Sequence, residues 1–430
     1  MIALLVLATL APGCRDRGEA ASTPSAGPDG LSDPSSSRAA DQDRIARSSD
    51  LARDLGEEPA SDRHGTMPFA ECPVSSERAL DPDALLDRAS DSYAAGEFAV
   101  AYACADMATA LVPNSVDAHH TRAAAASALG HHDVAQVTFA LALALDPEDP
   151  ETLAAAAEFY INVLPTRHRD TIRVGLEYAR RGRSRAVVRR RTGRALRARL
   201  ALLEAQAYND LARSEDALER VTEALQLAPD LVDATHEKGV ALFNLCRFDD
   251  AESAFAAVLH ATPDDPYAHH HLALLYERSG REQDSQRHFL RARELAPGEF
   301  WAPVLLSEQE FRAELAEAVS ELPPELDKRL HGVALEVADV PARADLVAVE
   351  PPFSPTILGL FRGLPHGVEA PEGADTEAIP ARTIVLYRKN LARAAKSRQE
   401  LDEQIRRTLV HEIGHLSGLD EDDLRRRGLD

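Results

Sequence analysis

Two histidines and a glutamate near the C-terminal end of the sequence have the types and the spacing of a metal site. The stretch 406–421 reads RRTLVHEIGHLSGLDE and contains the pattern H-E-x-x-H. On a helix, positions i and i+4 share one face, so His411 and His415 can direct their imidazoles at one ion. Glu412 lies beside them, where it can take a proton from an attacking water. The pattern predicts a zinc site with a carboxylate base.

A helix must position these residues, and the surrounding sequence predicts one. Ser397 and Glu400 have the S-x-x-E spacing of a capping box, and apolar or site residues then recur every three or four positions. Gly418 is a natural stop for this helix. The two histidines therefore extend a buried stripe, on which polar side chains need a partner such as a metal ion. The alternative is a chance match on a solvated helix.

A catalytic zinc ion usually has three protein ligands, so a third ligand is expected after the motif. Fifteen residues follow His415, and the acids among them are Asp420, Glu421, Asp422, Asp423 and Asp430. In the extended pattern H-E-x-x-H-x-x-G-x-x-[H/D], the turn falls on Gly418 and the ligand on Glu421. Glu421 is our first choice for the third ligand, and Asp420 is the second.

The segment 307–430 resembles the small bacterial zincin-like metallopeptidases of the minimal zincin type. The matching stretches are LPPEL at 322–326, VALEV at 333–337, ILGLF at 357–361, TIVLYR at 383–388 and the motif with its GLDE tail. The resemblance implies a compact α+β domain, a single zinc ion and the hydrolysis of peptide bonds. The sequence departs from the family at Glu421, where Asp is usual, and it has no counterpart of the Met-turn of larger metzincins.

Three short strands are expected inside this domain, at 333–337, 356–361 and 383–387. A Pro- and Gly-rich loop at 363–380 precedes the last strand and is expected to line or cover the cleft. In zincins generally, an edge strand beside the active helix holds the substrate as an added strand, and 383–387 is our candidate. Tyr387 and His366 are the candidates for a donor to the oxyanion.

Prolines recur with a 34-residue period upstream of this domain, first at Pro113 and Pro147 and then at Pro229, Pro263 and Pro297. Small residues occur at one phase of the period, namely Ala101, Ala135, Ala217 and Ala251. The pattern resembles the tetratricopeptide repeat (TPR), a helix pair that stacks on its neighbours. We predict about six repeats over residues 82–300, with an irregular repeat at 151–197.

The predicted fold class is mainly α, a TPR α-solenoid followed by a small α+β zincin-like domain at 307–430. The concave face of such a solenoid usually binds a peptide or a partner protein. The alternative is a spacer or an oligomerisation scaffold. The net charge of −23 argues against a nucleic-acid partner. Thirteen arginines lie between Arg167 and Arg199, and they either dock acidic peptides or anionic lipids or pair with nearby acids.

Residues 1–14 have the features of a signal or lipoprotein-type segment. An apolar run from Ile2 to Leu10 is too short to span a bilayer. Gly13 and Cys14 follow it as in a bacterial lipobox, which would place a lipid on Cys14 and attach the protein to a membrane. Residues 15–81 are rich in Ser, Pro, Asp and Gly, and they predict a disordered linker. We expect export to the bacterial periplasm or cell envelope, with a plain signal peptide as the alternative to lipidation.

The remaining cysteines show no metal-ligand spacing. Cys104 and Cys246 fall in predicted repeat helices, and we expect both to be small core residues. Cys72 and Cys104 are the candidate pair for a disulfide if the protein is exported.

Two functions remain open from the sequence. The first is a secreted or lipid-anchored zinc metallopeptidase whose repeats recruit a substrate or partner. Its metal ligands would be His411, His415 and Glu421, and its catalytic base would be Glu412. The second is a non-catalytic TPR scaffold or assembly lipoprotein whose zincin domain is structural or inactive. The intact Glu412 favours the enzyme, because a purely structural zinc site needs no base.

Overall fold

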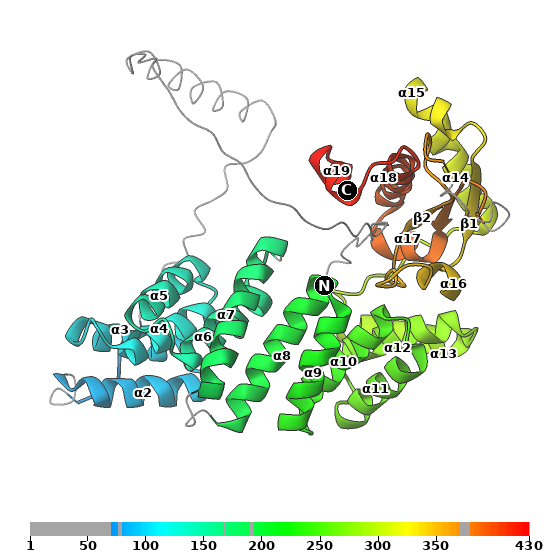
Figure 1. The fold of residues 1–430 in the computed structure, drawn as a ribbon. Helices are drawn as coiled ribbons and strands as arrows, with labels where there is room; N and C mark the ends of the chain where they lie inside the picture. The colour runs from blue at the N-terminus through cyan, green and yellow to red at the C-terminus, as the bar shows by residue number, and fades with distance from the viewer. Residues whose placement is uncertain (1–69, 76–79, 167, 189–192, 370–378, 430) are drawn as a thin grey trace, which may run out of the picture.

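The structure is a computed structural model that describes residues 70–75, 80–166, 168–188, 193–369 and 379–429 (Figure 1). The predicted signal segment, the lipid on Cys14 and most of the predicted linker lie outside these described residues. Within the described ranges, no helix is both long enough and apolar enough to cross a membrane.

In the first part of the described chain, successive helices pair and stack side by side into a solenoid (Figure 1). Two residues after the repeat prolines Pro147 and Pro263, an acid begins the next helix pair. Asp149 and Asp265 are the N-caps of helices whose first turns contain Pro150 and Pro266. The alanines of the repeat pattern are fully buried where helices meet. The helices are α2 (Pro82–Ala94), α3 (Phe98–Leu111), α4 (Val116–Ala128), α5 (His132–Leu145), α6 (Pro150–Glu158), α7 (Arg169–Val188), α8 (Arg194–Asp210), α9 (Ser214–Leu227), α10 (Val232–Asn244), α11 (Phe248–Ala261), α12 (Pro266–Arg278) and α13 (Glu282–Leu295).

The irregular repeat contains a π-helical turn and a long helix. Helix α6 continues into the turn η2 (Phe159–Val163), and α7 follows it. Gly175 lets α7 pack closely on that turn, because an added Cβ would lie 2.6 Å from Ile161 Cγ1. The extra chain length therefore forms a helix that packs between α6 and α8.

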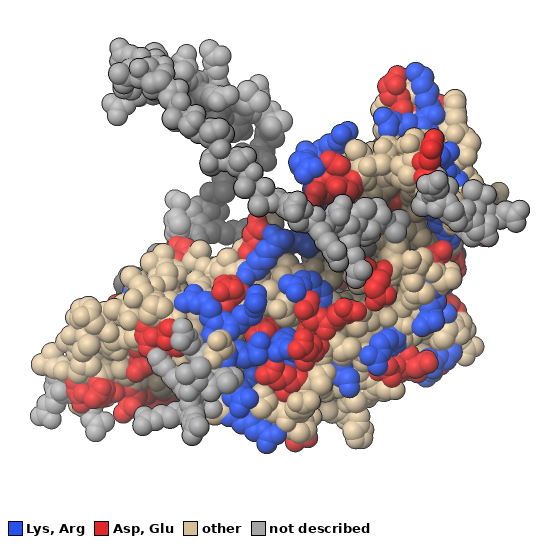
Figure 2. Space-filling view, in the orientation of Figure 1, with Lys and Arg blue, Asp and Glu red and all other residues tan. Residues whose placement is uncertain are grey.

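The arginine-rich segment forms ion pairs with neighbouring helices. Arg183 Nε lies 2.6 Å from Glu204 Oε1, and Arg183 Nη1 lies 3.6 Å from Glu223 Oε2. Arg199 pairs with Glu158. Figure 2 shows basic and acidic side chains interleaved over the middle of the solenoid. For these described arginines the pairing with nearby acids is observed, whereas the side chains of 185–192 lie outside the described part.

The C-terminal domain contains a three-stranded sheet with helices packed on it. Strand β3 (Thr383–Tyr387) pairs in parallel with β1 (Ala334–Ala338) and antiparallel with β2 (Gly359–Arg362), so the order is β1-β3-β2. All five residues of β3 are buried. The prediction that 383–387 is the edge strand for substrate is therefore wrong. In the described sheet β3 is central, and β2 is an edge strand against which α18 (Arg398–Leu416) packs.

The main core of this domain lies between α18, the sheet and α14 (Glu308–Ser320). Ser307 and Glu310 form a capping box at the start of α14, in which each side chain accepts a hydrogen bond from the other residue's backbone N–H. The remaining short elements are α15 (Pro324–Asp327), η3 (Lys328–Leu330), α16 (Arg343–Leu346), α17 (Arg388–Ala394) and α19 (Glu421–Arg426). The predicted fold class, a helical solenoid followed by a small α+β domain, is confirmed.

The two domains share one buried cluster. Cys246 and Phe248, where α10 gives way to α11, pack against apolar side chains of the C-terminal domain, namely Leu346, Phe353, Ile357, Leu360, Val385 and Tyr387. Arg278 of α12 also donates a hydrogen bond to Pro341 O at 2.7 Å. Cys246 is buried as expected, but it lies between the domains rather than within one repeat. A C-terminal fragment on its own would leave this cluster incomplete.

A disulfide joins Cys72 to Cys104, the candidate pair from the sequence. Their Cα atoms are 4.8 Å apart, and Cys104 is buried in α3 against Ala89 of α2. The bond holds the described segment 70–75 against the first helix pair.

Candidate metal centre

The two ends of α18 fix the path of the chain around the motif. Ser397 Oγ accepts a hydrogen bond from Glu400 N at 3.2 Å. The Glu400 carboxylate accepts from Lys396 N at 2.7 Å and not from Ser397 N, so only half of the predicted capping box forms. At the other end, Gly418 has a φ of +81°, in the region that favours glycine. This turn ends α18 and leads into α19.

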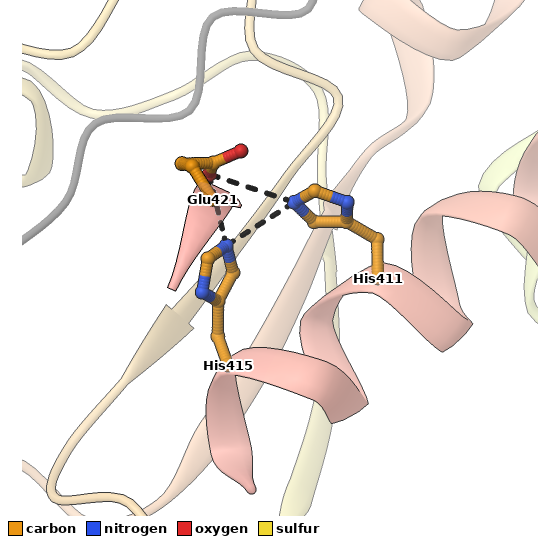
Figure 3. A group of neighbouring side chains, drawn as sticks. All are labelled: His411, His415 and Glu421. Atoms are coloured by element: carbon orange, nitrogen blue, oxygen red, sulfur yellow. Dashed lines mark hydrogen bonds and ion pairs between the residues drawn. The ribbon is translucent and has the colours of Figure 1, made fainter. Parts of the chain in front are cut away.

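The structure brings together the three residues that the sequence proposes as metal ligands (Figure 3). The Nε2 atoms of His411 and His415 are 3.1 Å apart. Glu421 Oε1 lies 3.1 Å from His415 Nε2 and 3.8 Å from His411 Nε2. Around a tetrahedral zinc ion with bonds of about 2.0–2.2 Å, ligand atoms lie roughly 3.3 Å apart. The three atoms therefore have nearly the spacing that zinc requires.

The other ring nitrogen of each histidine is bound to the main chain. His411 Nδ1 lies 2.8 Å from Leu429 O, and His415 Nδ1 lies 3.0 Å from Leu419 O. A carbonyl oxygen only accepts, so both Nδ1 atoms donate and both Nε2 atoms keep a lone pair. When both rings are neutral, two lone pairs and a carboxylate oxygen thus converge with no proton donor among them. A cation fits this donor set, and the carbonyl contacts hold the rings in the ligating orientation.

The acid that follows Leu419 has a different role from Glu421. Asp420 is the N-cap of α19, and its Oδ1 accepts a hydrogen bond from Asp423 N at 2.8 Å. Glu421 is the first residue of that helix and is buried, whereas Asp422 is exposed. Burial would raise the pKa of Glu421, but the adjacent imidazoles of His411 and His415, which donate to its carboxylate when they are protonated, outweigh burial and lower the pKa. The geometry therefore favours Glu421 over Asp420 as the third ligand.

Substitutions at these two acids are expected to have different effects on zinc. Glu421→Ala removes a proposed ligand atom and should raise the zinc dissociation constant by more than about 100-fold, which exceeds the usual effect of losing a residue that only supports a ligand. Asp420→Ser keeps an N-cap acceptor and should leave zinc binding nearly unchanged. Competition with a chromophoric chelator measures both, with exposed Asp422→Ala as the matched control. A larger loss from Asp420→Ser than from Glu421→Ala would move the third ligand to Asp420.

Glu412 is the buried carboxylate beside the ligands. It is 1% exposed, and among the described residues neither of its oxygens forms a hydrogen bond of good geometry. Burial raises the pKa of Glu412 to about 7, although His415, His411 and the nearby backbone N–H of Phe361 oppose the rise. Burial alone would lower the pKa of His415, but Glu421 and Glu412 outweigh it and raise that pKa. An acid–base group with a pKa near neutrality is suited to take up and return a proton.

Two glycines that the sequence interpretation did not single out allow this arrangement. An added Cβ on Gly359 of β2 would lie 2.8 Å from Glu412 Oε1. An added Cβ on Gly414, inside the motif, would collide with Leu424 of α19. Gly414 therefore lets α19 pack directly on α18 and brings Glu421 to the histidines. For Gly414, the available signal was a glycine in the last turn of an amphipathic helix before the stop at Gly418, because a helical glycine lowers helix stability and calls for a packing reason.

Tyr387 and His366, the two candidate oxyanion donors, lie in environments that differ from that of the proposed metal ligands. Tyr387 is fully buried in the cluster shared with the solenoid. Burial raises the pKa of its hydroxyl well above the usual range. His366 Nε2 bonds to Arg329 O at 2.9 Å, and its backbone N–H donates to Leu416 O at 2.7 Å. The described loop 363–369 thus contacts the end of α18, whereas 370–378 lies outside the described residues.

Two family models match parts of this chain. The model of the zincin-like metallopeptidase family matches residues 330–429, and a tetratricopeptide repeat model matches 210–275. The chain therefore carries a zincin-like metallopeptidase domain after TPR repeats, as predicted, although the family match begins later than the predicted 307. The metallopeptidase domain indicates a peptidase, and the repeats indicate a protein-interaction domain. No curated protein matches the chain.

Several solved structures are similar to part of this chain. Pseudomonas aeruginosa PilF is 17% identical with a TM-score of 0.43, over 55% of this chain and 98% of that one. YrrB, described as a TPR protein with an unusual peptide-binding site, is 16% identical with a TM-score of 0.35, over 45% and 92%. MamA from AMB-1 is 21% identical with a TM-score of 0.32, over 41% and 96%. These similarities concern the fold alone.

Proposed function

We propose that the protein is a zinc-dependent metallopeptidase that hydrolyses peptide bonds, with a TPR domain that binds a substrate or partner. The observation that carries this proposal is the convergence of two imidazole lone pairs and the Glu421 carboxylate beside a buried carboxylate, Glu412. Three such ligands are typical of a catalytic zinc site, which keeps a fourth position for water or substrate.

Each residue of the site has a role in this reaction. His411, His415 and Glu421 would hold the zinc ion. When bound, zinc supplies Lewis acidity and lowers the pKa of water toward neutrality. Glu412 would take the proton of the attacking water and pass it to the leaving amine. The described edge strand β2 lies beside α18, and an extended substrate would add to it as a further strand.

The alternative is a non-catalytic TPR scaffold whose zincin domain is structural or inactive. The buried cluster shared by Cys246 and the C-terminal domain supports a scaffolding role for the solenoid. A carboxylate that is buried without a hydrogen-bond partner is costly, and a structural zinc site has no use for it. Glu412 therefore supports the enzyme over the scaffold.

Export to the periplasm or cell envelope is part of the same proposal. The disulfide between Cys72 and Cys104 supports it, because such bonds persist in oxidising compartments. The apolar run and Cys14 support lipid attachment, and the linker would let the folded domains stand away from the membrane.

The purified full chain is expected to contain about one zinc ion and to cleave peptides. Metal analysis measures the first property, and digestion of a mixed-sequence peptide library, read by mass spectrometry, measures the second. A chelator should stop the cleavage and added zinc should restore it. Zinc without any cleavage would favour the scaffold, and the absence of bound zinc would contradict the metal site.

A further inference from the structure

The segment 353–358 leads into edge strand β2, and one buried side chain holds its backbone. Asn390 of α17 donates from Nδ2 to Pro355 O at 3.1 Å and to Ile357 O at 2.7 Å. Its Oδ1 accepts a hydrogen bond from Arg393 Nη2 at 2.8 Å. Asn390 is 5% exposed, so these bonds are shielded from water. The position of the segment therefore depends on Asn390.

Arg393 connects Asn390 to the solenoid. Its Nη1 donates to Glu277 Oε1 at 3.2 Å, and its Nη2 lies 2.9 Å from Glu277 Oε2 as an ion pair without hydrogen-bond alignment. The guanidinium also lies 5.4 Å from the ring centroid of Phe289 on α13. The Glu277 side chain is only 7% exposed, so solvent screens the pair weakly. Helices α12 and α13 thus hold α17 in place.

The solenoid also contacts the segment 353–358 directly. Ser354 Oγ donates to Asn244 Oδ1 at 3.3 Å. Cys246 Sγ lies 3.8 Å from Phe353 O and donates a weak hydrogen bond. The backbone that precedes β2 is therefore held from two sides, by α10 and by α17.

Strand β2 in turn packs against the candidate base. At Gly359 there is no space for a methyl group, because an added Cβ would lie 2.8 Å from both Glu412 Oε1 and Thr408 Cγ2. Glu412 has no hydrogen bond of good geometry to orient it among the described residues. The packing of β2 therefore sets the position of its carboxylate, and a shift of β2 would move the base.

We propose that the TPR solenoid positions the catalytic base. Glu277 acts through Arg393 and Asn390 on the segment 353–358, and through β2 on Glu412. The inference rests on the proposed function, because it concerns the base of that reaction. Glu277, Arg393 and Asn390 are positioning residues. Release of α17 from the solenoid lowers turnover but leaves the metal bound, because the ligands come from α18 and α19.

Two variants of the full chain test this inference, with the most rapidly cleaved peptide of the mixed library as the probe. Glu277→Gln removes the charge that holds Arg393. Lys389 of α17 also pairs with Glu277, at 3.3 Å, but it keeps Asp339 and Glu282 as partners in this variant. Asn390→Asp removes both donors to the segment. Each should lower kcat by about 10- to 100-fold, the scale of a misplacement of about 1 Å. KM should change by less than about threefold, and zinc content should stay at one ion.

Two further measurements separate positioning from general damage. The first is the kcat of the double variant that carries both Glu277→Gln and Asn390→Asp. If both residues act on the same segment, its kcat should be about that of the worse single variant. Glu252→Gln is the matched control, because Glu252 pairs with Arg281 inside the solenoid and should leave kcat unchanged. If Glu277→Gln does not fold, Arg393→Lys is the milder variant, since one ammonium cannot replace the fork that reaches both Glu277 and Asn390.

Unchanged kcat in both variants of an active protein would overturn the inference alone. Loss of zinc together with kcat would also overturn it, because the contacts would then support the whole domain. An inactive wild-type chain would overturn the proposed function, and the inference with it.

Discussion

Replacing Glu412 with Gln is expected to lower kcat for peptide hydrolysis by about 10²- to 10⁴-fold while zinc stays bound. The amide is nearly isosteric with the carboxylate but cannot accept the proton, so the chemical step alone should suffer. The loss corresponds to roughly 3 to 5 kcal/mol of activation free energy. The site tolerates a neutral group there, because Glu412 is 1% exposed and burial already raises its pKa to about 7. Steady-state kinetics with metal analysis of the same sample measures both quantities.

The matched control for this variant is Glu403→Gln. Glu403 is an exposed residue of the same helix and accepts a hydrogen bond from Gln399, so the same chemical change there should leave kcat unchanged. An active Glu412→Gln protein would assign the base to another group. Loss of zinc along with activity would make Glu412 a structural residue and favour the scaffold.

His411→Ala is expected to abolish zinc binding at micromolar metal and, with it, all cleavage. The substitution removes one of the three proposed ligand atoms and leaves only the Nε2 of His415 and the carboxylate of Glu421 to hold the ion. The loss in affinity should exceed about 100-fold, which is the upper range for outer partners of a metal site. Inductively coupled plasma analysis of the purified variant measures zinc per chain.

His331→Ala is the control for the loss of an imidazole. His331 is an exposed histidine of the same domain, so its variant should keep one zinc ion and full activity. If His411→Ala retains a full equivalent of zinc, the metal lies elsewhere and the proposed site is wrong.

Local features of the fold were predictable from the sequence. Gly418 ends α18 as predicted, and the third expected strand has the bounds of β3, Thr383–Tyr387. Both depend on residues that are adjacent in sequence. The place of β3 in the sheet depends on pairing with strands that lie far away in the chain. A continuous apolar run such as TIVLY nevertheless favours a strand buried on both faces, which argued against an edge position.

Other features of the site could not be predicted, because they depend on tertiary contacts. In the sequence, nothing distinguishes Glu277 from the other acids on amphipathic helices. Its ion pair with Arg393 forms only when the chain is folded. The close contact of Gly359 with Glu412 joins positions that are 53 residues apart. The preference for Glu421 over Asp420 as the third ligand follows from helix α19, because the Asp420 carboxylate is used as the N-cap of that helix.

The partners that orient the two histidines are main-chain carbonyls, of Leu419 and Leu429. Every residue type has the same carbonyl group. The orientation of the two rings therefore depends on the path of the backbone and not on the identity of the side chains at these two positions. Evolution can therefore replace either leucine with another apolar residue at little cost to the metal. An insertion or deletion in the last dozen residues has no such freedom, since it shifts the carbonyls away from the rings.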